Sequence, residues 1–206
     1  MIKEDNKANG KNVVAAFDFD GTITTKDTLF HFAKFVLGWF KFAVALLFFL
    51  PTAFKLFTKQ MSNAKAKEVL FTLFFKSFEI EKLQEYSKQY ANEIDKILNK
   101  EALEKINYHK SKGHKLTIVS ASVEIWIVPW AQKMGFEKVI ATKAEIQNGK
   151  ITGNFASANC NGPEKPVRFL EQYPERKEYQ LYAYGDTTGD LPLLKLADYP
   201  FYKKYN

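Results

Sequence analysis

The sequence predicts an α/β fold, in which a doubly wound, mostly parallel sheet carries an inserted α-helical segment and a small β-hairpin. Three observations support this prediction. Apolar strand segments alternate with helical segments, the pattern of a helix-covered parallel sheet, over residues 13–22, 100–145 and 165–201. Residues 25–99 lack strand alternation and are expected to be helical throughout. The Asn-Gly pair at Asn148 indicates a hairpin within residues 143–155.

The first strand ends in two carboxylates. Residues 13–17 are apolar and are followed by Asp18, Asp20, Gly21 and Thr22. Side chains alternate along an extended chain, so Asp18 and Asp20 would share one face, and Gly21 permits a sharp turn. Such a pair suits phosphoryl transfer, because one carboxylate can attack phosphorus while the other handles protons. An ordinary strand that ends in an Asp-Gly turn is the alternative.

A second carboxylate pair follows a strand near the other end of the chain. Residues 181–184 are apolar, and directly after them come Gly185, Asp186 and, four residues further on, Asp190. In an open parallel sheet the loops at the carboxyl ends of the strands converge, so both pairs are expected in one cleft. A hard divalent cation with oxygen ligands, Mg²⁺, would offset their repulsion and the charge of a phosphate.

Two further segments supply candidate phosphate ligands. The strand at residues 115–119 precedes Ser120 and Ala121, where a hydroxyl and loop amides can hold a phosphoryl oxygen. Lys165 opens a predicted helix, and its ammonium would complete the clamp as a compact positive charge. Alternatively, Ser120 or Ser122 caps the next helix, and Lys165 is solvated as most lysines are.

In this order the motifs resemble those of the haloacid dehalogenase (HAD) superfamily of aspartate-nucleophile phosphatases. Residues 18–22 match the first motif, Ser120 the second, Lys165 the third and residues 185–190 the fourth. The helical segment after the first motif is similar to subfamily IB, the phosphoserine phosphatase-like branch. The resemblance implies a HAD-like Rossmannoid core with a helical cap, whose expected bounds are 1–24 with 100–206, and 25–99.

The resemblance also implies roles for the matched residues. Asp18 would be the nucleophile that becomes an aspartyl phosphate, Asp20 the general acid and then base, and Lys165 a charge partner of both Asp18 and the phosphoryl group. Phosphoryl contacts are expected from Thr22, Ser120, Ala121 and Lys165.

The same resemblance implies a metal site. Mg²⁺ would be held by the carboxylates of Asp18 and Asp186 and by the main-chain carbonyl of Asp20. Gly21 and Asp190 would support this arrangement.

These motifs predict a Mg²⁺-dependent phosphomonoester hydrolase. Its expected substrate is a small phosphometabolite or a lipid phosphate such as phosphatidylglycerophosphate, because residues 160–165 are similar to the phosphatidylglycerophosphate phosphatases of the superfamily. Phosphoserine fits less well, since Gly21 replaces a serine and Asp27 a glutamate of the phosphoserine phosphatases. The alternatives are a phosphotransferase or mutase of the same family, and a catalytically silent membrane- or protein-binding module.

Composition restricts the partners. The chain of 206 residues carries a formal net charge of +7, which favours a phosphorylated substrate or an acidic membrane surface. Recognition-helix, aromatic RNA-binding and dense basic motifs are missing from the sequence, so no nucleic-acid partner is expected. The single cysteine, Cys160, fits a reducing compartment. Residues 1–12 are polar and predict no secretory signal, hence a cytoplasmic location, peripheral at the inner face of a membrane in one interpretation.

Residues 29–57 are strongly apolar and contain no acidic residue; they are interrupted or flanked by Lys34, Lys41, Lys55 and Lys59. The uncharged stretch between Lys41 and Lys55 is shorter than the roughly 18 to 20 residues of a membrane-spanning helix, so crossing is not expected. Two interpretations stay open. The helix lies in a membrane interface, with lysines toward headgroups, or its side chains pack the core of the cap and its contacts.

Overall fold

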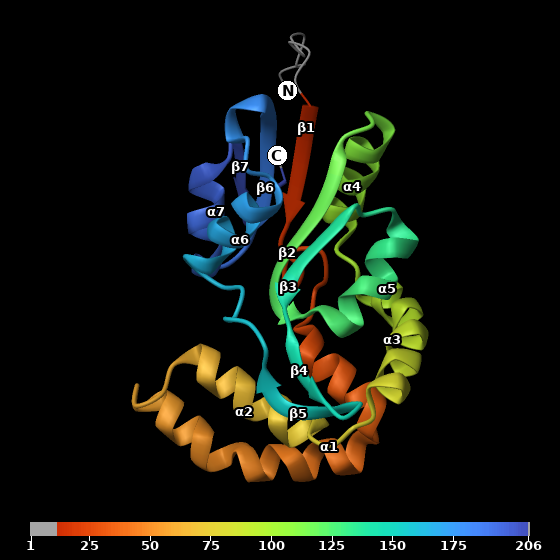
Figure 1. The fold of residues 1–206 in the computed structure, drawn as a ribbon, viewed down its shortest axis with the longest axis vertical. Helices are drawn as coiled ribbons and strands as arrows, with labels where there is room; N and C mark the ends of the chain where they lie inside the picture. Colours follow the sequence, from red (N-terminus) through yellow and green to blue (C-terminus); the bar gives the residue numbers. More distant parts are fainter. Residues whose placement is uncertain (1–11, 206) are drawn as a thin grey trace.

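The computed structural model describes residues 12–205, and Figure 1 shows their arrangement. Five parallel strands form one sheet in the order β3-β2-β1-β6-β7. Their bounds are β1 Asn12–Phe17, β2 Lys115–Val123, β3 Lys138–Thr142, β6 Tyr179–Gly185 and β7 Tyr199–Tyr202. The predicted parallel sheet is confirmed. Residues 1–11, which bear most of the prediction that no secretory signal is present, lie outside the described residues.

Strand β1 contributes to two apolar cores, one on each face of the sheet. Ala15 and Phe17 belong to the larger core, and Val14 and Ala16 to the smaller one. Helices α4 and α5 supply side chains to the larger core, while α6 and α7 cover the opposite face. Their bounds are α4 Lys100–Ser111, α5 Glu124–Met134, α6 Glu164–Gln172 and α7 Leu191–Leu196. Helices on both faces make the sheet doubly wound, as predicted.

The predicted helical insertion between β1 and α4 is confirmed. It contains α1 Thr28–Phe57, α2 Asn63–Phe75, α3 Ile80–Ile94 and a 3-10 turn at Asp95–Ile97. Asp27 caps α1, because its Oδ1 accepts the backbone N–H of Leu29 at 2.9 Å. Ser62 caps α2 in the same way, accepting the N–H of Lys65 at 3.2 Å. We call these three helices the cap.

Helix α1 changes direction at Gly38, whose φ of 72° and ψ of 166° are not helical. Glycine adopts a positive φ without the steric cost of a Cβ atom. Before Gly38, Phe32 and Ala33 are buried in the larger core. After it, α1 runs along the side of α2 that faces away from the sheet (Figure 1).

The predicted hairpin is also present. It consists of β4 and β5, Ala144–Gln147 and Lys150–Phe155. Asn148 and Gly149 at its turn have φ of 51° and 74°, and positive φ at both central residues is typical of a type I′ turn. The hairpin contacts the cap, since Ser77 donates its backbone N–H to the Ile151 carbonyl at 2.8 Å. A segment distant in sequence therefore completes the cap.

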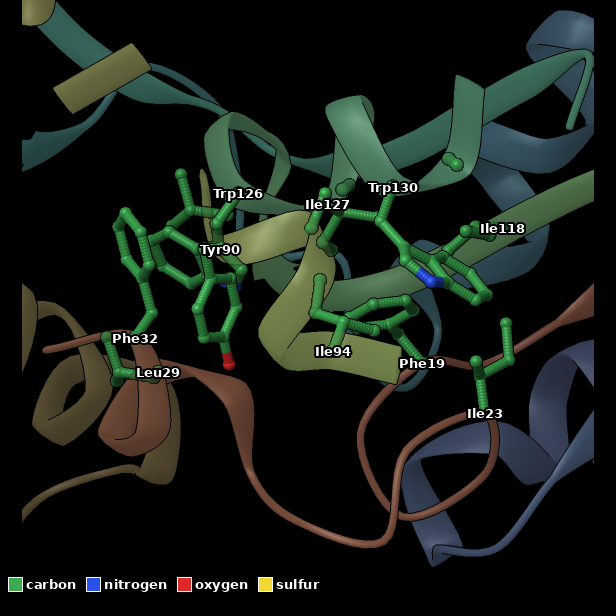
Figure 2. Close-up of a cluster of buried hydrophobic side chains, with 14 of the residues drawn as sticks. Phe19, Ile23, Leu29, Phe32, Tyr90, Ile94, Ile118, Trp126, Ile127 and Trp130 are labelled. Carbon is green, nitrogen blue, oxygen red and sulfur yellow. The ribbon is translucent and has the colours of Figure 1, made fainter. Parts of the chain in front are cut away.

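Cap and sheet share one apolar core, which Figure 2 shows in close-up. The ring of Phe32 in α1 lies 5.1 Å from that of Trp126 in α5 and 4.9 Å from that of Tyr90 in α3, measured between centroids. Burying one phenylalanine contributes about 1.5 to 3 kcal/mol. This shared core holds the cap over the carboxyl end of β1.

A buried histidine makes this fold sensitive to acid. His109 in α4 is fully buried. Its Nε2 shares a hydrogen bond with the Tyr184 hydroxyl at 2.9 Å, and its Nδ1 shares one with Nδ1 of His114 at 2.7 Å. Burial lowers the pKa of His109 from 6.5 to about 3. The imidazole is therefore neutral in the folded protein at pH 5, whereas in the unfolded chain it is protonated.

Because the unfolded chain binds a proton at His109 that the folded protein excludes, acid should favour unfolding. Lowering the pH from about 7 to about 5 should decrease the free energy of unfolding by about 2 kcal/mol through this residue alone. Urea unfolding of the wild type and of His109→Gln at both pH values isolates the effect. The wild type should lose about 2 kcal/mol more than the variant, and equal losses would contradict the assignment.

Candidate active site

A cavity of about 430 Å³ lies where the loops after β1 and β6 and the carboxyl end of β2 meet the cap. In the sheet, β2 lies on one side of β1 and β6 lies on the other. The chain enters β2 from α4, which packs on one face, and reaches β6 through α6, which packs on the opposite face. Such a switch in strand order leaves a crevice at the carboxyl ends of the strands. The lining includes Asp18, Asp20, Gly21, Ser120, Ala121 and Lys165.

Lys165 is buried between two carboxylates. Its Nζ donates to Asp18 Oδ1 and to Asp190 Oδ1, both at 2.5 Å, and to the Val119 carbonyl at 2.9 Å. An ammonium group has three N–H donors, so each has an acceptor here. Lys165 lies in the first turn of α6 and is 1% exposed, which places its charge in a poorly solvated setting. The arrangement joins three distant parts of the sequence.

Burial and charge shift the titration of this group of residues. Burial raises the pKa of Asp18 to about 7, against the lowering effect of the Lys165 ammonium. Burial by itself would lower the pKa of Lys165, but the Asp18 and Asp190 carboxylates raise it above its ordinary value. Lys165 is therefore cationic at neutral pH. A further positive charge near Asp18 would favour its ionised, nucleophilic form.

Asp20 is oriented by donors from the cap and from β2. Its Oδ1 accepts the backbone N–H of Thr28 at 2.9 Å and the Thr28 hydroxyl at 2.5 Å, and its Oδ2 accepts the Ser122 hydroxyl. Trp126 Nε1 donates to Thr28 Oγ1 at 3.0 Å and so fixes that hydroxyl in turn. Neither serine caps α5, whose N-cap residue Val123 makes no side-chain capping bond.

Asp186 comes from the loop after β6. Its Oδ1 accepts the Thr22 hydroxyl at 2.9 Å, and burial raises its pKa. Carboxylate oxygens of Asp18, Asp186 and Asp190 lie within 4.8 Å of one another. The Thr22 hydroxyl is thus directed to Asp186, and its contact with a phosphoryl group stays a prediction. The three carboxylates form a candidate centre for a cation.

Asp190 organises the loop that carries Asp186. Its Oδ2 accepts the backbone N–H of Asp186 at 3.2 Å and both the N–H and the hydroxyl of Thr187, at 2.9 and 2.8 Å. Its Oδ1 accepts from Lys165. Both oxygens of Asp190 therefore have partners within the protein, which suits a supporting role and leaves Asp18 and Asp186 as the candidate direct ligands.

Ser120 and Ala121 line the cavity from within β2. The Ser120 hydroxyl accepts the backbone N–H of Ser122 at 3.1 Å. The prediction that the strand stops before Ser120 is wrong, since β2 continues to Val123. A register shift against β3 between Ser120 and Val123 marks irregular pairing where the strand lines the cavity.

Some side chains at the cavity escaped the sequence reasoning. Lys67 in α2 reaches from the cap, and its Nζ lies 3.3 Å from Ser122 Oγ and 3.8 Å from Asp20 Oδ2. No local sequence signal marks Lys67, because its position depends on how the cap packs over the sheet. Thr28 is the first residue of α1, directly after the N-cap residue Asp27, and the N-cap pattern in the sequence is a signal that could have indicated Thr28. Asp27 lines the cavity while it caps α1.

The fold and the site define a capped α/β hydrolase of the phosphatase type. Residues 15–195 match the family of haloacid dehalogenase-like hydrolases, and the chain belongs to this family. The resemblance seen in the motifs is thereby confirmed.

Related sequences agree with this assignment. The chain is 29% identical over 195 residues to protein CicA of Caulobacter vibrioides, covering 93% of this chain and 86% of that protein. It is 35% identical over 98 residues to a probable phosphatase of Mycobacterium tuberculosis, covering 46% of this chain and 33% of that protein.

Solved structures share the fold. A protein of unknown function from Bordetella pertussis superimposes with a TM-score of 0.78 at 21% identity, covering 90% of this chain and 86% of that one. A phosphoserine phosphatase with a phospho-aspartyl intermediate analogue gives 0.61 at 19% identity, covering 91% and 84%. Structural neighbours of this chain thus include phosphoserine phosphatases.

A substitution at Gly21, compared with one at a matched glycine, should separate displacement of the Asp186 carboxylate from the backbone strain of a Cβ atom at positive φ. Gly21 has a φ of +83°, and a Cβ atom there would overlap the Asp186 carboxylate. We expect Gly21→Ala to displace Asp186 and to lower phosphatase activity by about tenfold to a hundredfold. The matched control is Gly113→Ala, at a φ of +70° with nothing within 4 Å of the added Cβ.

Both alanine variants should lower the free energy of unfolding by about 1 kcal/mol, because each places a Cβ at positive φ. Only Gly21→Ala should lose activity. Similar kcat/KM values for the two variants would show that Gly21 does not set the position of Asp186.

Proposed function

We propose that this protein is a Mg²⁺-dependent phosphomonoester hydrolase that works through an aspartyl-phosphate intermediate. The observation that carries the proposal is the buried Asp18 carboxylate with the Lys165 ammonium 2.5 Å from its Oδ1. The cavity that they line is also lined by Asp20, whose carboxylate is oriented by Thr28 and Ser122. A carboxylate nucleophile that is ion-paired with a lysine, next to a second carboxyl group with its own hydrogen-bond donors, suits two-step phosphoryl transfer.

In the first step, Asp18 Oδ2 attacks the phosphorus while Lys165 holds Oδ1. The bond from phosphorus to the leaving oxygen breaks, and Asp20 in its protonated form donates its proton to that oxygen. The products are the free alcohol, an acyl phosphate on Asp18 and an ionised Asp20. Lys165, and the backbone at Ser120 and Ala121, offset the negative charge that develops on the phosphoryl oxygens.

In the second step, the Asp20 carboxylate accepts a proton from water as the water oxygen attacks the phosphorus. The bond between phosphorus and Asp18 breaks, which releases inorganic phosphate and restores the Asp18 carboxylate. Asp20 is left protonated for the next cycle. The hydrogen bonds from Thr28 and Ser122 keep Asp20 in one orientation for both proton transfers.

The residues at the candidate metal centre fit Mg²⁺. The donors are all oxygen, as a hard cation requires. The buried Asp18 and the half-buried Asp186 have raised pKa values, and a nearby cation would lower both. Asp18, Asp186 and the Asp20 carbonyl would hold the ion. When bound, Mg²⁺ would supply charge neutralisation for the phosphoryl group.

Metal removal should therefore abolish hydrolysis. We expect EDTA to stop phosphate release and added Mg²⁺ to restore it. In a thermal unfolding assay Mg²⁺ should raise the midpoint of the wild type, since it binds only the folded state. Asp186→Asn should raise the Mg²⁺ concentration that gives half of this stabilisation by about tenfold or more. Hydrolysis that persists in EDTA would remove Mg²⁺ from the mechanism.

The substrate is proposed as a phosphomonoester with either a small polar or a lipid leaving group. Lys26 and Lys67 line the cavity beside Lys165, which favours an anionic substrate. A panel of phosphorylated metabolites and of lipid phosphates in mixed micelles, including phosphatidylglycerophosphate, would identify the leaving group by release of inorganic phosphate. Transfer of phosphate to an added alcohol without release would indicate a phosphotransferase, and inactivity on the whole panel would contradict hydrolysis.

A further inference from the structure

The part of α1 that follows Gly38 carries an apolar surface directed away from the protein. Large apolar side chains on this part of the helix are each at least 60% exposed. We call this set the outer face, and its members are Trp39, Phe40, Leu47, Phe48, Leu50, Phe54 and Phe57. Single exposed apolar residues are common, but so many on one helix mark an interaction surface.

The opposite side of the same segment is packed against α2. Phe42 and Ala45 are buried, and the Phe42 ring stacks on that of Phe74 in α2 with 5.5 Å between centroids. The helix is therefore anchored by this side, and the outer face is free of the fold. Figure 1 shows this part of α1 along the edge of the molecule, on the far side of α2 from the sheet.

The surroundings of the outer face are basic. Between Asp27 and Glu68 the sequence contains no acidic residue. Exposed lysines lie within or beside the segment, namely Lys34, Lys41, Lys55 and Lys59. The Nζ of Lys34 lies 4.8 Å from the ring centroid of Trp39, so cation and aromatic ring meet at one end of the outer face.

We propose that the outer face docks this protein on the surface of an anionic lipid bilayer, with α1 parallel to the membrane plane. Its aromatic and leucine side chains enter the boundary of the acyl chains, and the lysines contact the headgroups. Charge decides the occupant. A second copy bound through the same face would bring the lysines of the two copies together, so that like charges would repel, whereas anionic lipid supplies the opposite charge.

An orientation parallel to the membrane also follows from the structure of α1. By length and composition alone, α1 could cross a membrane. However, Gly38 breaks the helix, and Lys41 and Lys55 leave an uncharged run shorter than the roughly 18 to 20 residues needed. Crossing would also separate Phe42 from Phe74. Docking by the outer face keeps this contact, and no outer-face residue lines the cavity, so the inference does not depend on the proposed reaction.

Vesicle flotation of the full chain tests the proposal. We expect binding to vesicles of phosphatidylcholine with phosphatidylglycerol, weaker binding to phosphatidylcholine alone, and loss of binding as salt is raised. Trp39 reports insertion directly, because the other two tryptophans, Trp126 and Trp130, are fully buried. Its emission should shift to the blue and be quenched by brominated lipid.

Matched variants separate charge from apolar contact. Lys41→Glu with Lys55→Glu should reduce binding to anionic vesicles by about tenfold or more, because each lysine near the surface adds attraction. Lys177→Glu with Lys195→Glu makes the same charge change at exposed positions of the α/β core and should bind as the wild type does. Phe54→Ser should remove most of the quenching of Trp39 by brominated lipid, because α1 would then insert less deeply.

Three results would overturn the proposal. The first is equal vesicle binding, or none, by the wild type and both lysine double variants. The second is a dimer in solution that Phe54→Ser dissociates, without vesicle binding, which would assign the outer face to a second copy. The third is retention in membranes after alkaline carbonate, which would indicate a spanning helix. Hydrolysis of a soluble phosphomonoester should be unchanged in all these variants, so failure to dock is distinct from failure of the proposed reaction.

Discussion

Replacing Asp18 with asparagine should reduce the rate of phosphate release by about a thousandfold or more. An amide oxygen cannot form the acyl phosphate that the carboxylate forms, although its size and position are nearly unchanged. The fold should persist, with a free energy of unfolding within about 1 kcal/mol of the wild type, because Asp190 still pairs with Lys165. Steady-state kinetics and urea unfolding measure the two effects separately. A variant with full activity would refute the assignment of Asp18 as the nucleophile.

Asp20→Asn provides the matched control, since it changes the neighbouring carboxyl without touching the nucleophile. It should slow hydrolysis of an alkyl phosphate strongly, because the poor leaving group needs a proton. The formation of phosphoenzyme from p-nitrophenyl phosphate should suffer less, because p-nitrophenolate leaves without one. Asp18→Asn should fail with both substrates. An identical substrate pattern in the two variants would argue against Asp20 as the general acid.

Lys165→Met should have the second large effect, on stability as well as on rate. Methionine fills a similar volume but leaves Asp18 and Asp190 facing each other without the cation that now lies 2.5 Å from each. Removing one partner from a buried charge cluster costs about 3 to 5 kcal/mol. The free energy of unfolding at neutral pH in EDTA should fall by about that amount, and phosphate release should become barely measurable.

Mg²⁺ should recover part of the lost stability of Lys165→Met, because a cation bound by Asp18 offsets the repulsion between the carboxylates. The exposed substitution Lys177→Met removes one lysine charge without removing a buried pair and should leave unfolding unchanged within about 0.5 kcal/mol. Equal free energies of unfolding for the two variants would show that the buried Lys165 ammonium does not stabilise the protein.

The sequence was sufficient for the sheet, the helical insertion and the hairpin. Alternating apolar residues, strand-end glycines and the Asn-Gly turn act on their immediate neighbours, so their effect can be read locally. The chain order of Asp18, Ser120, Lys165 and Asp186 can also be read from the sequence, because Asp18 and Asp186 follow strands, Ser120 follows an apolar strand segment and Lys165 opens a helix. In a parallel sheet such positions converge at one edge.

Other features of the site depend on contacts between distant segments. Thr28, Ser122 and Lys67 converge on Asp20 from α1, β2 and α2, and no local pattern announces that meeting. The end of β2 also differs from the sequence prediction, for a related reason. Irregular pairing with β3 extends the strand past Ser120, and pairing is a property of two segments.

For residues 29–57, the sequence by itself determined an apolar helix with basic interruptions and no acids. It could not determine which side of that helix is buried, because apolar residues occur on nearly every side. Only the tertiary structure decided this: Gly38 redirects the helix, α2 covers the side of Phe42, and the outer face is left exposed. Apolar character is a property of each side chain, whereas burial depends on which neighbours the complete fold brings to it.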